Sequence, residues 1–305
     1  MLYLIIPCYN EQEVLPGSHE RLLALVRSLP LTTTLFYVDD GSTDNTWSII
    51  QSMCRNCENV RGLRLSHNVG QQTAVWAGLE HCVVDGDAFI TIDADLQDDL
   101  EAVGRMVEEW LKGTDVVYGV RRKRHTDTFI KRFTAIMFYR IMDWMGCETV
   151  YNHSEFRLLS RRVAMALLSY PERNLFLRGI VPLLGFRSTN VYYDRKARMA
   201  GDTKYGLVRL AGLAFEGITS FSIRPLHWIL AAGLFSILIA FGVIGWALFN
   251  HFTRQAVPGW TSLLVSQWLV GGILLMAVGL TGEYVGKVYK EAKRRPRYFV
   301  MEEIK

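Results

Sequence analysis

Two aspartates separated by one residue follow an apolar run in the first third of the chain. They are Asp93 and Asp95, in the sequence Asp-Ala-Asp-Leu-Gln that ends at Gln97. Alternate side chains of an extended segment point to the same side, so both carboxylates can share one divalent cation. Mg²⁺ and Mn²⁺ prefer hard oxygen ligands and complete their shell with water and substrate phosphates. The spacing therefore predicts a metal site of Asp93 and Asp95, to which Gln97 adds a carbonyl oxygen.

Three further groups of polar residues stand where strands are expected to end. They are residues 7–11 (Pro-Cys-Tyr-Asn-Glu), residues 39–42 (Asp-Asp-Gly-Ser) and the basic run 121–124 (Arg-Arg-Lys-Arg). In open α/β sheets, ligands bind beyond the carboxyl ends of the strands. Acidic and basic groups gathered at that edge predict a crevice for a metal–polyphosphate ligand.

The elements that must position these residues alternate along the first 120 residues. Apolar runs predict strands at 2–7, 35–40, 60–66, 87–93 and 115–120, and amphipathic patterns predict helices at 12–29, 43–54, 71–81 and 100–111. This alternation is typical of a Rossmann-like, mostly parallel α/β sheet. Because neither G-x-G-x-x-G after the first strand nor a P-loop motif is present, dinucleotide and P-loop sites are disfavoured.

The chain changes character from residue 225 onward. The runs 225–249 and 255–282 contain no Asp, Glu, Lys or Arg, and each exceeds the roughly 20 residues that cross a bilayer. We expect a transmembrane hairpin over 225–286, with helices at 226–249 and 260–284; helices of a globular core are the alternative. The segment just after the hairpin is basic, with Lys287, Lys290, Lys293, Arg294, Arg295 and Arg297. The positive-inside rule then places residues 1–224 and the C-terminus in the cytoplasm.

Composition narrows the class of protein further. The 305 residues are 50% apolar and 21% charged, which excludes a disordered or low-complexity chain. A net charge of +4 is too weak to indicate a nucleic-acid partner. The five cysteines fit a reducing compartment. The expected organisation is a cytoplasmic domain at 1–205, an amphipathic helix beside the membrane at 206–224, the hairpin at 225–286 and a basic tail at 287–305.

Several motifs in order resemble those of family 2 glycosyltransferases, which have the GT-A fold. These motifs read PCYNEQE, VDDGSTDNT, NVGQQTAVWAGL and DADLQDD. The C-terminal part, with RMAGDTKY before the hairpin and GEYVGKVYKEAKRRPRYFV at its end, resembles the polyprenyl-phosphate glycosyltransferases. These include bactoprenol glucosyltransferases, dolichyl-phosphate mannose synthases and undecaprenyl-phosphate aminoarabinose transferases. The resemblance covers essentially the whole chain.

The resemblance implies a role for each group of residues. The base and ribose of a nucleotide sugar would be contacted by Pro7, Tyr9, Glu11 and Asp40. The metal ion on its diphosphate, Mg²⁺ or Mn²⁺, would be held by Asp93, Asp95 and Gln97. The diphosphate or the acceptor would be clamped by Arg198 and Lys204, and the acceptor phosphate would be bound by Arg121, Lys131 and Arg132. Residues 39–42 can equally form a β-turn with Asx capping of a helix at Thr43. Both readings can hold together.

Glu155 departs from the pattern of the family. Many relatives have Gly-Asp-Phe-Arg where this chain has Ser154-Glu155-Phe156-Arg157, and their Asp is assigned as a base or an acceptor-orienting group. Glu155 keeps the carboxylate and adds a methylene. It is therefore either a catalytic group with shifted geometry or an exposed residue ahead of a helix capped by Ser160.

The implied reaction is transfer of one sugar to undecaprenyl phosphate at the cytoplasmic face of the inner membrane, with inversion and a metal ion. UDP-glucose is the expected donor, and a UDP-aminoarabinose derivative, UDP-galactose or GDP-mannose are alternatives. A processive polysaccharide synthase is disfavoured because no Q-x-x-R-W motif is present. A non-catalytic membrane scaffold is the remaining alternative. We expect a multi-pass membrane protein that forms homo-oligomers.

Overall fold

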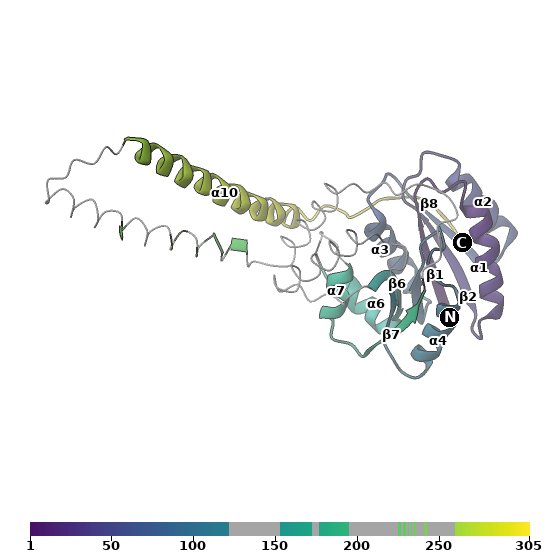
Figure 1. The fold of residues 1–305 in the computed structure, drawn as a ribbon. Coiled ribbons are helices and arrows are strands. Elements are labelled where there is room, and N and C mark those ends of the chain that lie inside the picture. Colours follow the sequence, from purple (N-terminus) through teal and green to yellow (C-terminus); the bar gives the residue numbers. More distant parts are fainter. Residues whose placement is uncertain are drawn as a thin grey trace, which may run out of the picture. The chain divides into compact units, whose positions relative to one another are not determined.

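The chain contains an eight-stranded sheet with the strand order β7-β5-β6-β4-β1-β2-β3-β8, and Figure 1 labels several of its strands and the helices beside them. The structure is a computed structural model, and it describes residues 1–121, 153–172, 177–194 and 260–305, with scattered positions between 225 and 242. The chain divides into two compact units. The first comprises Met1–Arg140, Glu148–Gly206 and Arg294–Lys305, and the second comprises Ile141–Cys147 and Leu207–Lys293.

Most strands of the sheet run in one direction. The parallel set consists of β1 (Leu2–Cys8), β2 (Thr33–Asp39), β3 (Val60–Leu65), β4 (Ala88–Thr91), β5 (Val116–Arg121) and β7 (Ser188–Tyr193). Two strands run the other way: β6 (His153–Ser160) lies between β4 and β5, and β8 (Val300–Ile304) pairs with β3. The carboxyl ends of β1 to β5 therefore meet at one edge of the sheet, as the sequence predicts.

The described helices are α1 (Leu15–Ser28), α2 (Thr46–Asn56), α3 (Gln71–Cys82), α4 (Glu101–Leu111), α6 (Arg161–Leu168), α7 (Leu177–Leu183) and α10 (Trp260–Ala292). The first four lie where helices are predicted, with ends that differ by up to three residues. The expected helix start at Thr43 is wrong, because α2 begins at Thr46. Instead, the backbone of Thr43 and Asn45, ahead of this helix, is hydrogen-bonded to the loop after β1.

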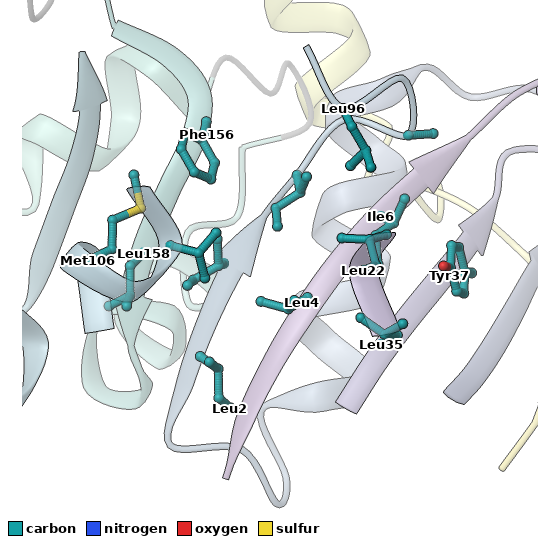
Figure 2. Close-up of a cluster of buried hydrophobic side chains, with 14 of the residues drawn as sticks. Leu2, Leu4, Ile6, Leu22, Leu35, Tyr37, Leu96, Met106, Phe156 and Leu158 are labelled. Atoms are coloured by element: carbon teal, nitrogen blue, oxygen red, sulfur yellow. The ribbon is translucent and has the colours of Figure 1, made fainter. Parts of the chain in front are cut away.

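The core explains why the strands read as unbroken apolar runs. Residues 2 to 6 of β1 have no exposed surface, because both faces of the sheet are covered. On one face, Leu2, Leu4 and Ile6 belong to a cluster that reaches from α1 and β2 to α4 and β6 (Figure 2). Its labelled members on those elements are Leu22 on α1, Leu35 and Tyr37 on β2, Met106 on α4, and Phe156 and Leu158 on β6.

The end of the predicted basic tail forms part of the sheet. Strand β8 pairs antiparallel with β3 along the free edge of the sheet. The Glu302 carboxylate accepts hydrogen bonds from Trp47 Nε1 and Gln51 Nε2 on α2, both at 2.9 Å. Before the strand, the Arg297 guanidinium lies 4.1 Å from the centre of the Trp76 ring on α3. The tail is thus fixed to the first unit at three elements.

Removing residues 300–305 should lower the free energy of unfolding of the first unit by about 2 kcal/mol. The deletion removes the hydrogen bonds between β8 and β3 and the two hydrogen bonds to Glu302. The net contribution of one such hydrogen bond is about 1 kcal/mol or less. Urea denaturation followed by circular dichroism measures the change. Deletion of Lys305 alone is the control, because this exposed residue follows β8 and its Nζ pairs with the nearby Glu303 at 3.6 Å. Equal stability of both shortened chains would show that β8 adds nothing.

The expected membrane segments are only partly covered by the description. The helix expected at 206–224 lies outside the described residues, as does most of the first span at 226–249. The second span falls within α10. Among the described residues, no helix combines the length and apolar character needed to cross a bilayer.

Candidate active site

The loop after β1 and the turn after β2 are bonded to each other. The backbone N–H of Asn10 donates to Ser42 Oγ at 3.0 Å, and the N–H of Thr43 donates back to Asn10 Oδ1 at 2.9 Å. Asn10 has a φ of +54°, a conformation that Asn tolerates better than most residues. These bonds hold the loop in one shape, in which Tyr9 is 44% exposed. An exposed ring at a strand end suits stacking on a nucleotide base, whereas Pro7 is buried within β1.

The carboxylates of Asp39 and Asp40 are buried and accept hydrogen bonds from backbone N–H groups, while Asp39 Oδ2 forms an ion pair with Arg64 Nε at 3.4 Å. Asp39 Oδ1 accepts a hydrogen bond from the N–H of Ser42 at 3.1 Å, which is the expected turn. Asp40 accepts from the N–H groups of Val69 and Gly70 at 2.8 and 2.9 Å. Burial raises the pKa of both carboxyl groups, and these bonds oppose the rise. Asp40 therefore fixes the loop that precedes α3; its predicted contact with the nucleotide stays a prediction.

Gly41 lies where this turn meets the loop after β3. Its φ is +65°, and a Cβ there would lie 2.4 Å from the carbonyl carbon of His67. Gly41→Ala should therefore destabilise the first unit by about 2 kcal/mol, because strained backbone of this kind costs about 1–3 kcal/mol. Thermal unfolding measures the loss. Gly104→Ala on α4 is the control, since nothing lies within 4 Å of its added Cβ. Unchanged stability of Gly41→Ala would contradict the close approach.

The predicted metal-site residues come together after β4. Gln71 Nε2 on α3 donates to Asp93 Oδ1 at 2.6 Å, and Gln97 Nε2 donates to Asp95 Oδ2 at 2.7 Å. Leu96 between them has a φ of +46°, and its side chain is buried in the core (Figure 2). Leu96 thus has a strained backbone conformation just before Gln97 and just after the two aspartates. Backbone strain of this kind is concentrated at functional sites. The described ranges contain no group of three or more His, Cys, Asp or Glu side chains arranged to hold a metal.

Negative charge is concentrated around Asp93. Burial raises the pKa of Asp93 to about 7, with further contributions from Asp98, Asp95 and Glu155, while Arg121 opposes the rise. We call these five residues together with Gln97 the carboxyl-edge site. Glu155 is paired with Arg157 and Arg178, so three carboxylates, those of Asp93, Asp95 and Asp98, face Arg121 in this set. The site therefore has the charge to attract a cation.

Arg121 is held by two residues that the sequence analysis did not select. Its Nε donates to the Tyr193 hydroxyl at 3.2 Å, and its Nη2 lies 3.5 Å from Asp98 Oδ1. The Tyr193 hydroxyl in turn donates to Asp98 Oδ1. Asp98 belongs to the DADLQDD motif and could have been selected as its next carboxylate. Tyr193, 95 residues further along the chain, gives no such signal.

Glu155 is not an exposed residue ahead of a helix, so that expectation is wrong. It lies on β6 with 7% of its surface exposed. Its carboxylate contacts Arg157 Nη2, and it accepts a hydrogen bond from Arg178 Nε at 2.7 Å. The catalytic alternative is still open. The remaining predicted residues, Lys131, Arg132, Arg198 and Lys204, lie outside the described residues.

Comparison with solved structures identifies the class of fold. The crystal structure of glucosyl-3-phosphoglycerate synthase from Mycobacterium tuberculosis in complex with phosphoglyceric acid is similar, with a TM-score of 0.52 at 18% identity. The match covers 72% of this chain and 78% of that one. Together with the strand order, it shows the GT-A type of mostly parallel α/β sheet.

The sequence pattern described as Glycosyl transferase family 2 matches residues 3–168. The glycosyltransferase YkoT of Bacillus subtilis (strain 168) is 43% identical, over 98% of this chain and 91% of its own length. The bactoprenol glucosyl transferase of Shigella phage SfX is 38% identical, over 97% of each chain. The chain therefore belongs to glycosyl transferase family 2, and it is a glycosyltransferase, as the motifs predict.

Proposed function

We propose that the protein transfers glucose from UDP-glucose to undecaprenyl phosphate. The observation that carries this proposal is the near full-length similarity to proteins named bactoprenol glucosyl transferase, at 38% identity in Shigella phage SfX and in a prophage homologue of Escherichia coli K12. The carboxyl-edge site supports it, because acidic residues and Arg121 adjoin there as a metal–diphosphate and a phosphate acceptor require.

The residues of the carboxyl-edge site fit a divalent cation. Burial is the main cause of the raised pKa of Asp93, and the negative charges of Asp98, Asp95 and Glu155 add to it. Asp93 and Asp95 would hold Mg²⁺ or Mn²⁺, with Gln97 beside them and waters and phosphate oxygens as the other ligands. When bound, the ion neutralises charge on the departing nucleoside diphosphate.

The other residues of the site would bind and orient the two substrates. Tyr9 offers its exposed ring to uracil, with Glu11 and the backbone at Pro7 alongside, and Asp40 supports the neighbouring loop. Arg121 is aimed by Asp98 and Tyr193, and it would hold the acceptor phosphate. That phosphate is anionic near neutral pH and can attack the sugar directly, so a strong general base is less necessary. A single displacement inverts the anomeric carbon.

We also propose that residues 225–286 anchor the enzyme in the inner membrane as a hairpin, with residues 1–205 in the cytoplasm. The charge-free runs support this, and α10 exposes large apolar side chains along its length. Five of them are Val270, Leu274, Leu275, Met276 and Val278, with exposures of 57–75%. Apolar side chains of this kind are stable in lipid. Glycine-rich stretches such as Gly271-Gly272 would allow close helix approach in a homo-oligomer.

Mass spectrometry of the lipid product tests the proposal. Membranes that contain the protein are given undecaprenyl phosphate and UDP-glucose, UDP-galactose, GDP-mannose or a UDP-aminoarabinose derivative. Glucosyl-phosphoryl-undecaprenol from UDP-glucose is the expected product, and membranes without the protein are the control. A product from another donor only would refute the glucose assignment, and no product from any donor would refute the acceptor as well.

A further inference from the structure

Arg178 is a partly exposed cation with a fixed orientation. It is the second residue of α7, and 40% of its side chain is exposed. Its Nε donates to Glu155 Oε1 at 2.7 Å. Within the described part of the chain, no hydrogen bond or ion pair is shown for its two Nη groups. They present a planar pair of donors, the geometry that matches a phosphate or carboxylate.

The start of α7 is joined to the carboxyl-edge site through α3. The backbone N–H of Leu177 donates to Gln72 Oε1 at 2.8 Å, while the adjacent Gln71 donates to Asp93. Two consecutive glutamines therefore contact the residue before Arg178 and one of the metal-site carboxylates. Arg157 Nη1 also donates to the Leu177 carbonyl at 3.0 Å, which fixes α7 from the side of β6.

The pairing of β4 with β6 brings Glu155 to the same place. In this antiparallel pair, Thr91 lies opposite Arg157. Asp93 comes two residues after Thr91 and Glu155 two residues before Arg157, so both follow directly from the end of this pairing. Glu155 thus contacts Arg178 and is near enough to Asp93 for its charge to raise the pKa of that group, and the contacts through Gln71 and Gln72 connect the same groups by a second route.

In the described part of the chain, two arginines, Arg157 and Arg178, are paired with the Glu155 carboxylate. Arg157 is 2% exposed and already compensates the buried Glu155 carboxylate. A second arginine is not needed for that purpose, since one carboxylate neutralises one guanidinium. The positive charge of Arg178 is therefore available to an incoming anion, on the exposed side of the cluster.

We infer that Arg178 binds a phosphate group of one of the two substrates, and that Glu155 is the positioning residue that holds its guanidinium. The inference deepens the proposed function and rests on it. The shared chemistry is a phosphate oxyanion, which can come from the diphosphate of the donor or from the phosphate of the lipid acceptor. The inference also gives Glu155 the role of holding the Arg178 guanidinium, in place of the role of a general base.

The test compares Arg178→Ala with wild type in two binding measurements on the full chain in detergent. One measures the affinity for UDP with Mn²⁺, and the other measures the affinity for undecaprenyl phosphate. Arg178→Ala should weaken one of them by about 10- to 100-fold, the range expected for hydrogen bonds to a charged group. The weakened ligand identifies the source of the phosphate. Unchanged affinities for both would overturn the inference.

Arg162→Ala is the matched control. Arg162 is also an exposed arginine paired with a carboxylate, that of Asp115 ahead of β5, at the opposite edge of the sheet. It should leave both affinities unchanged. Failure of the wild type to make the glucosyl lipid would refute the proposed function, whereas the affinity ratio between wild type and Arg178→Ala tests the inference separately.

Glu155→Gln distinguishes positioning from base catalysis. As a positioning residue, Glu155→Gln raises the same KM or Kd as Arg178→Ala, leaves kcat within a few-fold, and adds little when the two are combined. As a base, it would lower kcat about 10²- to 10⁴-fold and alter the pH profile. That second result would overturn the role given to Glu155. Circular dichroism confirms that each variant is folded, and Arg178→Lys should restore part of the binding.

Discussion

Replacing Asp95 with Ala should lower the rate of sugar transfer about 10³-fold, which corresponds to about 4 kcal/mol of activation free energy. Asp95 is one of two carboxylates proposed to hold the metal ion, and without the ion the charge on the leaving diphosphate is not neutralised. The fold should be preserved, because the substitution removes one negative charge from a site where carboxylates repel one another. Initial rates with UDP-glucose and Mn²⁺ binding by electron paramagnetic resonance measure the two effects.

Asp85→Asn is the control for this experiment. Asp85 precedes β4 at the other edge of the sheet, where it lies 3.1 Å from Arg61. It should keep wild-type activity and Mn²⁺ affinity. If Asp95→Ala also kept full biological activity, the non-catalytic scaffold would be the better description of the protein.

The affinity for Mn²⁺ should fall as the pH is lowered below about 7. The pKa of Asp93 in the metal-free protein is raised to about 7, so at lower pH the ion must displace a proton from this carboxyl group. Each pH unit below 7 should therefore weaken binding about tenfold, and the affinity should be nearly constant above pH 7. Between pH 7 and pH 5 the dissociation constant rises about 50-fold, because about half of the Asp93 carboxyl groups are already protonated at pH 7. Titration calorimetry across this range measures the slope and the proton released.

Asp93→Asn separates this effect from a general loss of charge. The variant should bind Mn²⁺ more weakly at every pH, and the steep slope between pH 5 and about 7 should be absent. Wild-type affinity that does not change with pH over this interval would mean that Asp93 is already ionised in the metal-free protein.

The first five strands and four helices could be predicted because each forms from local sequence. The strands are apolar runs because both faces of the sheet are buried, as every residue of β1 is. The helices are amphipathic because one side of each covers the sheet. Strand β8 could not be predicted, since Val300–Ile304 is short and contains two glutamates. It is a strand only because the free edge of β3, more than 230 residues earlier, accepts it.

The candidate site shows the same division. Strand ends carry Asp93, Asp95 and Arg121, so their proximity follows from the topology of a parallel sheet. The partners that orient them come from distant segments, as Tyr193 does for Arg121 and Arg178 does for Glu155. No spacing rule relates such pairs. Glu155 was ambiguous for a related reason, because its burial depends on the antiparallel strand β6.

The return of Arg294–Lys305 to the first unit makes the second unit an insertion rather than an appendage. A chain cut after residue 206 would lose β8 along with α10, and it would leave the edge of β3 open to pairing with other molecules. Aggregation of such a fragment would then say nothing about the stability of the native enzyme. A minimal catalytic unit is better made by joining residue 206 to residue 294 through a flexible Gly/Ser linker, which keeps the eighth strand in place.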